Sequence, residues 1–82
     1  MPATITAEQV ETVVYDALVT LGPSREDISR EATFEALDVD SLDLAELSQI
    51  VDEEFGVTLK GSDVANIKTV GDAIDLILAR AS

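Results

Sequence analysis

Hydrophobic positions recur at steps of three and four residues in three stretches of the chain, which is the spacing of one helix face. The stretches cover residues 7–21, residues 41–56 and residues 70–80. Residues 62–66 fit one short helix, and no stretch alternates with the period of two that marks a strand. The pattern predicts an all-α fold, a small four-helix bundle with three main helices and one short helix.

Capping residues agree with these boundaries. Gly22-Pro23 ends the first helix, and Gly56 ends the second. The predicted N-terminal caps are Thr6 with Gln9 for the first helix, Thr69 with Asp72 for the last, and Ser62 or Asp63 for the short one.

A long connection separates the first two main helices. Residues 22–39 show no sustained period and contain turn-forming Gly, Pro, Ser and Thr. Loops of this length are uncommon in a small domain unless they are anchored or functional. We expect Ile28, Phe34 and Leu37 to anchor it on the helices.

The second main helix has two distinct faces when its residues are placed 100° apart. The predicted core face holds Leu44, Leu47, Ile50, Val51 and Phe55. The opposite face holds Leu42, Gln49 and Glu53, flanked by Ala45 and Glu46. Leu42 is thus an apolar side chain predicted to face solvent, which suits a contact point for a partner.

The charge of the chain is strongly one-sided. Its 82 residues, which we expect to form one domain over 1–82, carry 17 acidic and 5 basic side chains, for a net charge of −12. Binding to nucleic acid or to an anionic membrane is therefore disfavoured. Nine acids and no base lie between residues 31 and 59: Glu31, Glu35, Asp38, Asp40, Asp43, Glu46, Asp52, Glu53 and Glu54. This stretch is either a solvated face or an electrostatic docking surface for basic partners.

The composition also argues against an enzyme. The chain has no cysteine and no histidine, which excludes disulfides, thiolate metal sites, a thiol nucleophile and a Ser-His-Asp unit. The spacing Asp38-x-Asp40-x-x-Asp43 resembles the start of a calcium loop, but Leu42, Asp43 and Gln49 stand where an EF-hand needs an oxygen ligand, Gly and Glu. We expect no dedicated metal site; loose binding of divalent cations to the acidic face stays open.

No targeting or membrane segment is predicted. The first residues carry no basic region followed by an apolar run, and no apolar stretch approaches the roughly 20 residues that span a bilayer. The expected location is cytoplasmic.

The triplet Asp40-Ser41-Leu42 opens the second main helix. Asp40 suits the N-cap, because its carboxylate can accept from the amide of residue 42 or 43. The Ser41 hydroxyl is then free to face solvent at the positive end of the helix dipole, where a phosphate ester is favoured. Ordinary helix capping explains the triplet equally well when it is taken alone.

The surroundings of this triplet resemble the acyl carrier protein family. The likeness runs through Ala32-Thr33-Phe34, Leu37 to Asp43, the helix end Glu53-Glu54-Phe55-Gly56-Val57 and the later segment Ile67 to Ala73, in the family's order and spacing. It covers essentially the whole chain.

The resemblance implies a 4′-phosphopantetheine arm, taken from coenzyme A, on Ser41, with Asp40 and Leu42 beside it. It implies service to a phosphopantetheinyl transferase, a ketosynthase, an acyltransferase and other acyl-processing enzymes with basic patches, by a carrier that is expected to be a monomer. The partner-binding positions that it implies are Leu42, Asp43, Ala45, Glu46, Gln49, Glu53 and Ile67. An arm at the helix start also suggests an acyl slot between the second and short helices, with Val51, Phe55, Leu59, Val64 and Ile67 as its candidate lining. The alternative is that most of these residues simply fill the core.

The chain departs from the family pattern at two places, of which the first bears on the geometry of the loop and the second on subtype. Asp38 follows Leu37 where the family usually has Gly, and the gap from Phe34 to Ser41 is one residue shorter than in typical fatty-acid-synthase carriers. The chain looks more like a discrete, type II carrier of polyketide synthases. Gln49 stands where an apolar contact is common. A peptidyl or aminoacyl carrier is the alternative, disfavoured by the charge, and a non-catalytic acidic adaptor is a further one.

Overall fold

The computed structural model describes residues 5–81, and these residues confirm the all-α prediction. The helices are α1 (Ala7–Leu21), the 3-10 turn η1 (Arg25–Asp27), α2 (Ser41–Phe55), α3 (Gly61–Asn66) and α4 (Val70–Ala81). Residues 1–4, on which the targeting expectation rests in part, and Ser82 lie outside the described residues.

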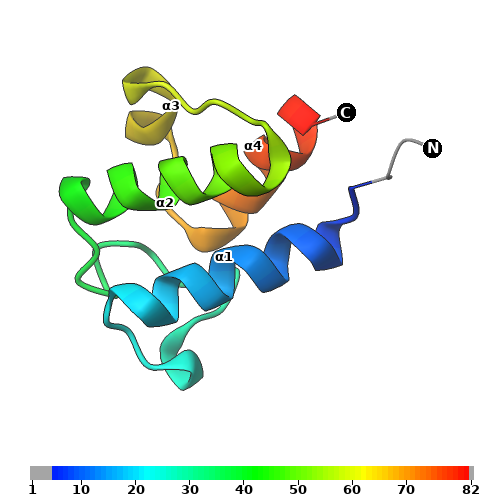
Figure 1. Cartoon of the computed structure of the whole chain (residues 1–82). Helices are drawn as coiled ribbons and strands as arrows, with labels where there is room; N and C mark the ends of the chain where they lie inside the picture. The colour runs from blue at the N-terminus through cyan, green and yellow to red at the C-terminus, as the bar shows by residue number, and fades with distance from the viewer. Residues whose placement is uncertain (1–4, 82) are drawn as a thin grey trace.

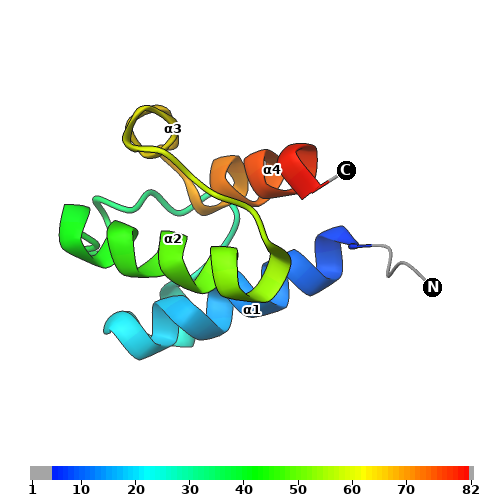
Figure 2. The same ribbon diagram turned by 45° about the horizontal axis from the view of Figure 1, so that its top comes forward.

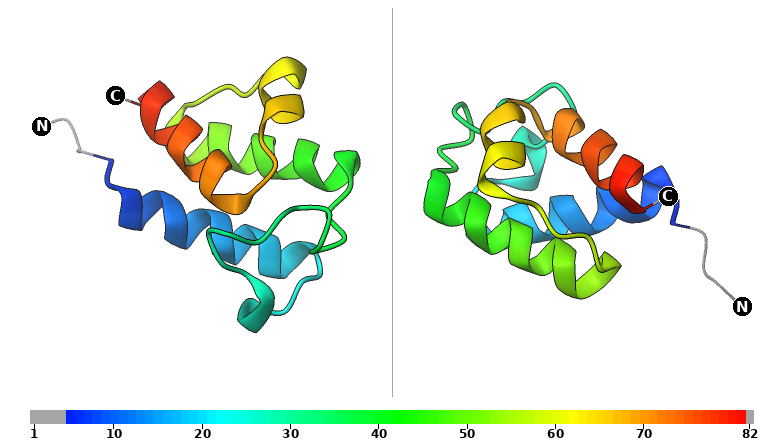
Figure 3. Two further views of the ribbon diagram at one scale, coloured as in Figure 1. Left: turned by 180° about the vertical axis from the view of Figure 1, so that it is seen from behind. Right: turned by 90° about the horizontal axis from the view of Figure 1, so that it is seen from above.

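Helix α1 packs against both α2 and α4. Figure 1 shows α1 and α2 side by side and antiparallel, so that the start of α2 lies near the end of α1 and the long connection. Helix α3 lies on the side of α2 that faces away from α1 (Figure 2). Figure 3 shows that the start of α1 and the end of α4 share the opposite end of the bundle. The topology therefore sets Ser41 apart from the start of α1 and the end of α4.

The predicted helix faces form one core. Its largest fully buried side chains are Leu18, Leu47, Ile74, Ile77, Val10, Val14, Val51 and Val70. The loop anchors are confirmed, because Ile28, Phe34 and Leu37 are all buried in the same cluster. On α2 only Leu47 and Val51 are fully covered, while Leu44, Ile50 and Phe55 pack at its edge.

Backbone hydrogen bonds tie the long connection to the start of α4. The Phe34 N–H donates to the Lys68 carbonyl at 3.0 Å, and the Val70 N–H donates to the Ala32 carbonyl at 3.0 Å, around an isolated bridge between residues 33 and 69. The Gly71 N–H donates to the Arg30 carbonyl at 2.8 Å. A Cβ on Gly71 would lie 2.9 Å from that carbonyl oxygen, so only glycine allows this approach.

The predicted capping boxes of α1 and α4 are confirmed. Thr6 and Gln9 exchange hydrogen bonds of 3.2 and 3.0 Å. Thr69 and Asp72 exchange bonds of 3.1 and 3.2 Å. These bonds satisfy amides that the first turn of a helix leaves unpaired.

The prediction for the short helix needs correction. It begins at Gly61, and neither Ser62 nor Asp63 is its N-cap. Asp63 is its third residue, where its carboxylate accepts from the Lys60 N–H at 3.0 Å. Asp63 therefore does not cap the helix from outside, but reaches back from the third helical position to the amide of the N-cap residue, Lys60. The turn η1 was not predicted, because three residues are too few to show a period.

Candidate functional site

Asp40 frees Ser41 from any capping role. The Asp40 Oδ1 accepts from the Asp43 N–H at 2.9 Å, as predicted, and the Asp43 carboxylate accepts from the Asp40 N–H at 3.4 Å. Ser41 is the first helical residue and is exposed. No group among residues 5–81 forms a hydrogen bond with its hydroxyl. The chain therefore presents an unengaged hydroxyl at the positive end of α2.

Asp38 adopts the backbone conformation that glycine would adopt most easily. Its φ of +58° lies in the left-handed region, the only such value for a non-glycine residue in the described part of the chain. The turn is closed by the Asp38 N–H donating to the Glu35 carbonyl at 3.1 Å and the Val39 N–H donating to the Phe34 carbonyl at 2.9 Å. Aspartate tolerates this region better than most residues. The loop therefore keeps the glycine-type turn that leads to Ser41 without the glycine.

The outer face of α2 is exposed as the wheel predicted. Leu42 is 77% exposed, the highest value among the large hydrophobic side chains of residues 5–81. The predicted contact residues that are also exposed are Ala45, Glu46, Gln49 and Glu53, while Asp43 is half-buried. Ile67 differs from this group, because it is only 9% exposed and belongs to the core.

The acidic surface formed by the nine carboxylates of residues 31–59 has no ion-pair partner among the described residues. Arg25 pairs with Asp16 on α1, and Arg30 pairs with Glu11 on α1 at 3.7 Å and with Asp75 on α4 at 2.9 Å. The arginines thus neutralise acids of other helices.

Two carboxylates outside the acidic surface are held ionised by local contacts. The backbone N–H of Lys60, followed by the Arg80 guanidinium at 2.6 Å, lowers the pKa of Asp63. The backbone N–H groups of Lys68 and Thr69 lower the pKa of Asp72. Both carboxylates therefore serve the starts of α3 and α4.

A hollow of about 610 Å³ adjoins Ser41 between α2 and α3. Its lining consists of Val39, Asp40, Ser41, Leu44, Ala45, Ser48, Leu59, Gly61, Val64 and Ala65. A volume of this size suits a small organic group. The hollow therefore lies between the helices where the acyl slot was predicted, and two of the predicted lining residues, Leu59 and Val64, line it.

Three of the five predicted slot residues do not line this hollow. Val51 is fully buried in the core. Ile67 lies in a separate depression with Asp63 and Asp72. Phe55 faces a second hollow of about 580 Å³ at the far end of α2. The slot opens toward the start of α2 because Leu44 and Ser48, not the last turn of the helix, face α3 across it.

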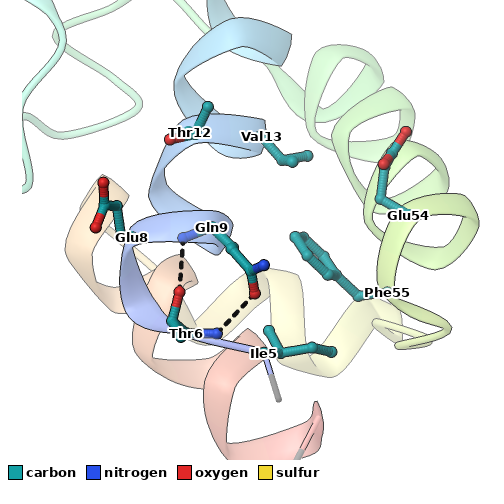
Figure 4. A pocket seen from close by; sticks show the side chains of 8 residues that line it. All are labelled: Ile5, Thr6, Glu8, Gln9, Thr12, Val13, Glu54 and Phe55. Carbon is teal, nitrogen blue, oxygen red and sulfur yellow. Dashed lines mark hydrogen bonds between the residues drawn. The ribbon is translucent and has the colours of Figure 1, made fainter. Parts of the chain in front are cut away.

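The second hollow lies between the start of α1 and the end of α2. Figure 4 shows Ile5, Val13 and Phe55 directed toward one another across it, beside the reciprocal bonds of Thr6 and Gln9. Ser41 is not part of its lining.

The chemistry of the first hollow suits a tethered group. It holds no histidine or thiol, and no cluster of three or more potential metal ligands occurs among residues 5–81. What it offers is a free hydroxyl beside a mainly apolar recess. A phosphate-linked arm on Ser41 would keep its phosphate at the helix start and leave the recess for an apolar load.

The comparisons with known proteins agree with this geometry. The family described as "Phosphopantetheine attachment site" matches residues 18–77. Acyl carrier proteins of two Nitratidesulfovibrio vulgaris strains, DP4 and Hildenborough, are each 44% identical over 71 residues, which cover 85% of this chain and 90% of theirs. The acyl carrier protein of Petrotoga mobilis is 35% identical over 71 residues, covering 85% of this chain and 80% of its own.

The fold and these matches define a phosphopantetheine-bearing carrier. The chain belongs to the acyl carrier protein family, and it is a carrier protein that uses a 4′-phosphopantetheine group, not a catalytic enzyme. Its role implies interaction with acyl-processing enzymes. No helix in the described part of the chain is long and apolar enough to cross a membrane.

Proposed function

We propose that Ser41 is the attachment point of the 4′-phosphopantetheine arm and that the chain delivers acyl groups held on it as thioesters. The observation that carries this proposal is the exposed, unbonded Ser41 hydroxyl at the start of α2, next to a 610 Å³ hollow. Asp40 and Leu42 flank the hydroxyl, Asp40 by capping the helix and Leu42 by projecting into solvent.

Attachment needs a transferase to supply the base, because the sequence has no histidine and the adjacent Asp40 carboxylate is engaged in capping α2. In the reaction the Ser41 Oγ bonds to the pantetheine phosphorus of coenzyme A, the pyrophosphate P–O bond breaks, and adenosine bisphosphate leaves. The transferase takes the hydroxyl proton. Once bound, the group supplies the thiol that the sequence lacks. Ser41 itself contributes the oxygen and its position at the helix dipole.

The acidic surface and the outer face of α2 form the proposed docking site. The partners that fit it are a phosphopantetheinyl transferase, a ketosynthase and an acyltransferase with basic patches. Its unpaired carboxylates would steer and orient such partners, and the exposed side chain of Leu42 would supply an apolar contact. The other contact residues are Asp43, Ala45, Glu46, Gln49 and Glu53. Ile67, which is only 9% exposed, is retained as a proposed contact beside the arm.

The hollow between α2 and α3 is the proposed shelter for the acyl chain. Its apolar lining from Val39, Leu44, Leu59 and Val64 favours removal of a hydrocarbon chain from water. Transfer of the acyl group to a partner enzyme requires the acyl chain to leave this hollow.

Polyketide synthesis is the proposed pathway, with the chain acting as a discrete, type II, monomeric carrier over residues 1–82. The short gap from Phe34 to Ser41 supports this subtype. The chain covers 90% of the length of the N. vulgaris proteins, which supports a single carrier domain. A cytoplasmic location stays a prediction. Loading by an adenylating enzyme would instead support the aminoacyl alternative.

Incubation with coenzyme A and a broad-specificity transferase tests the attachment site. The wild-type chain should gain one phosphopantetheine by intact mass, and Ser41→Ala should gain none. Ser24→Ala is the matched control, because Ser24 is exposed and makes no side-chain cap bond. It should be modified at the wild-type rate. A wild-type chain that stays unmodified, while the transferase modifies another carrier, would contradict the proposal.

A further inference from the structure

The hollow beside Ser41 contains one polar side chain away from the helix start. Besides Asp40 and Ser41, every lining residue except Ser48 is apolar or glycine. Ser48 lies seven residues after Ser41, which is two turns and ~10 Å along the helix at 1.5 Å per residue. It is partly buried. The hollow thus has one hydroxyl at the helix start, on Ser41, and a second, partly buried one on Ser48.

The Ser48 hydroxyl is oriented by the helix. Its O–H donates to the Leu44 carbonyl at 2.9 Å. A serine hydroxyl has one donor and two acceptor lone pairs, so this bond consumes the donor and leaves the oxygen able to accept. No donor among residues 5–81 reaches that oxygen. A bound group with its own O–H could donate a hydrogen bond to this oxygen.

We propose that Ser48 makes this carrier selective for acyl chains that bear a hydroxyl group. The inference rests on the proposed function, because it takes the tethered acyl group as the occupant of the hollow. A hydroxyl on the chain donates to the Ser48 oxygen and breaks no existing bond. A ketone cannot donate, and it is accepted only if the Ser48 hydrogen turns away from the Leu44 carbonyl. A saturated chain leaves the Ser48 oxygen without a donor.

The energetic scale of the selectivity follows from a single hydrogen bond in a partly buried site. Such a bond shifts an equilibrium by about threefold to tenfold. The order of protection should be hydroxyacyl first, then ketoacyl and saturated chains. Replacing Ser48 by Ala should remove the preference, because Ala keeps the helix and leaves only apolar surface at that position.

Cleavage of the thioester by hydroxylamine gives the readout. The full-length chain is loaded by a transferase from octanoyl, β-hydroxyoctanoyl, ζ-hydroxyoctanoyl and β-oxooctanoyl coenzyme A. Protection is the cleavage rate of the corresponding free acyl-pantetheine divided by that of the loaded protein. In the wild type, at least one hydroxyoctanoyl load should be protected about threefold to tenfold more than octanoyl. Ser48→Ala should abolish that difference. Amide chemical shifts of Leu44, Ser48 and Val64 should change with the protected load.

Two further variants separate the hydroxyl from other effects. Ser48→Thr keeps the hydroxyl and should retain the preference. Ser62→Ala removes an exposed serine of α3 that does not line the hollow, and it should behave as wild type. The inference would be overturned if all four loads were protected equally in the wild type. It would also be overturned if Ser48→Ala lowered the protection of octanoyl and hydroxyoctanoyl loads by the same factor. Neither outcome would affect the modification of Ser41. Failure of loading would contradict the proposed function itself, and this inference with it.

Discussion

Two regions of the molecule use their charges and contacts differently. One is the scaffold, which is formed by α1, α4 and residues 28–34. The other is the segment from Asp38 to Phe55. In the scaffold, arginines pair with acids and backbone hydrogen bonds join the loop to α4. In the segment, the acids have no ion pairs among the described residues, Leu42 is exposed and the start of α2 opens onto a hollow. The difference supports the proposal that partners bind on the segment, while pairing in the scaffold holds the loop and α4 against α1.

Gly71→Ala tests the scaffold and should have the largest effect on stability. The new Cβ would meet the Arg30 carbonyl oxygen at 2.9 Å, so the loop must move away from α4. We expect a loss of about 2 kcal/mol, the usual cost of overpacking. Urea unfolding measures it. Gly61→Ala is the control, because a Cβ there meets nothing within 4 Å. Equal stability of the two variants would show that the loop contact is not important.

Charge reversal tests the acidic segment. The double variant Glu46→Lys/Glu53→Lys should lower kcat/KM for the transferase by about tenfold at low salt, because steering by the acidic surface is lost. Its stability should not fall, since neither side chain forms an ion pair in the structure. Glu8→Lys/Glu26→Lys changes the net charge equally on exposed positions outside α2, and should keep most of the activity. Equal losses in both variants would mean that only net charge matters.

Asp38→Gly tests the turn that joins the two regions. Relief of the left-handed backbone contributes about 1 kcal/mol, and the greater freedom of unfolded glycine offsets about half of it. A net gain of about 0.5 kcal/mol in urea unfolding is therefore expected. Asp38→Val should instead lose about 1–2 kcal/mol, because a β-branched residue fits this region poorly. A gain for both variants would exclude strain at this position.

The smallest expected effect is on the way in which the stability of the fold falls at acidic pH, which the ionisation of Asp72 should influence. Backbone N–H groups lower the pKa of Asp72 in the folded state. The stabilisation from ionised Asp72 is therefore fully present above the pKa of the unfolded state, and it is lost as the pH falls through the pKa of the folded state. Below about pH 3.9, the ordinary aspartate value, stability should therefore fall. Asp72→Asn should flatten this fall in thermal melts. Glu26→Gln, which removes one exposed carboxylate of η1, is the matched control. An unchanged slope in Asp72→Asn would contradict the role of these bonds.

The four helices could be predicted from sequence because their signals are local. Periodicity and the caps at Thr6, Asp40 and Thr69 determine each helix within a few residues of its own start. The start of α3 was placed one residue late, since Asp63 satisfies an amide from inside the helix. The pairing of Phe34 with Lys68 joins residues far apart in sequence, and no local pattern contains it.

The candidate site was predicted less completely than the fold. The exposure of Leu42 and the N-cap of Asp40 follow from one helix, so sequence was sufficient for both. The lining of the hollow depends on how α3 is placed on α2. A helical wheel cannot give that placement, so Val51 and Phe55 were included and Ser48 was missed. A serine amid apolar positions on the inner side of α2 was the available signal.

Mass spectrometry of the chain purified from its native host tests the central claim most directly. Intact mass followed by fragmentation should place one phosphopantetheine on the peptide that contains Ser41, with or without an acyl load. A chain that carries no such group in the host, or that carries it on Ser24, Ser29 or Ser62 instead, would contradict the account.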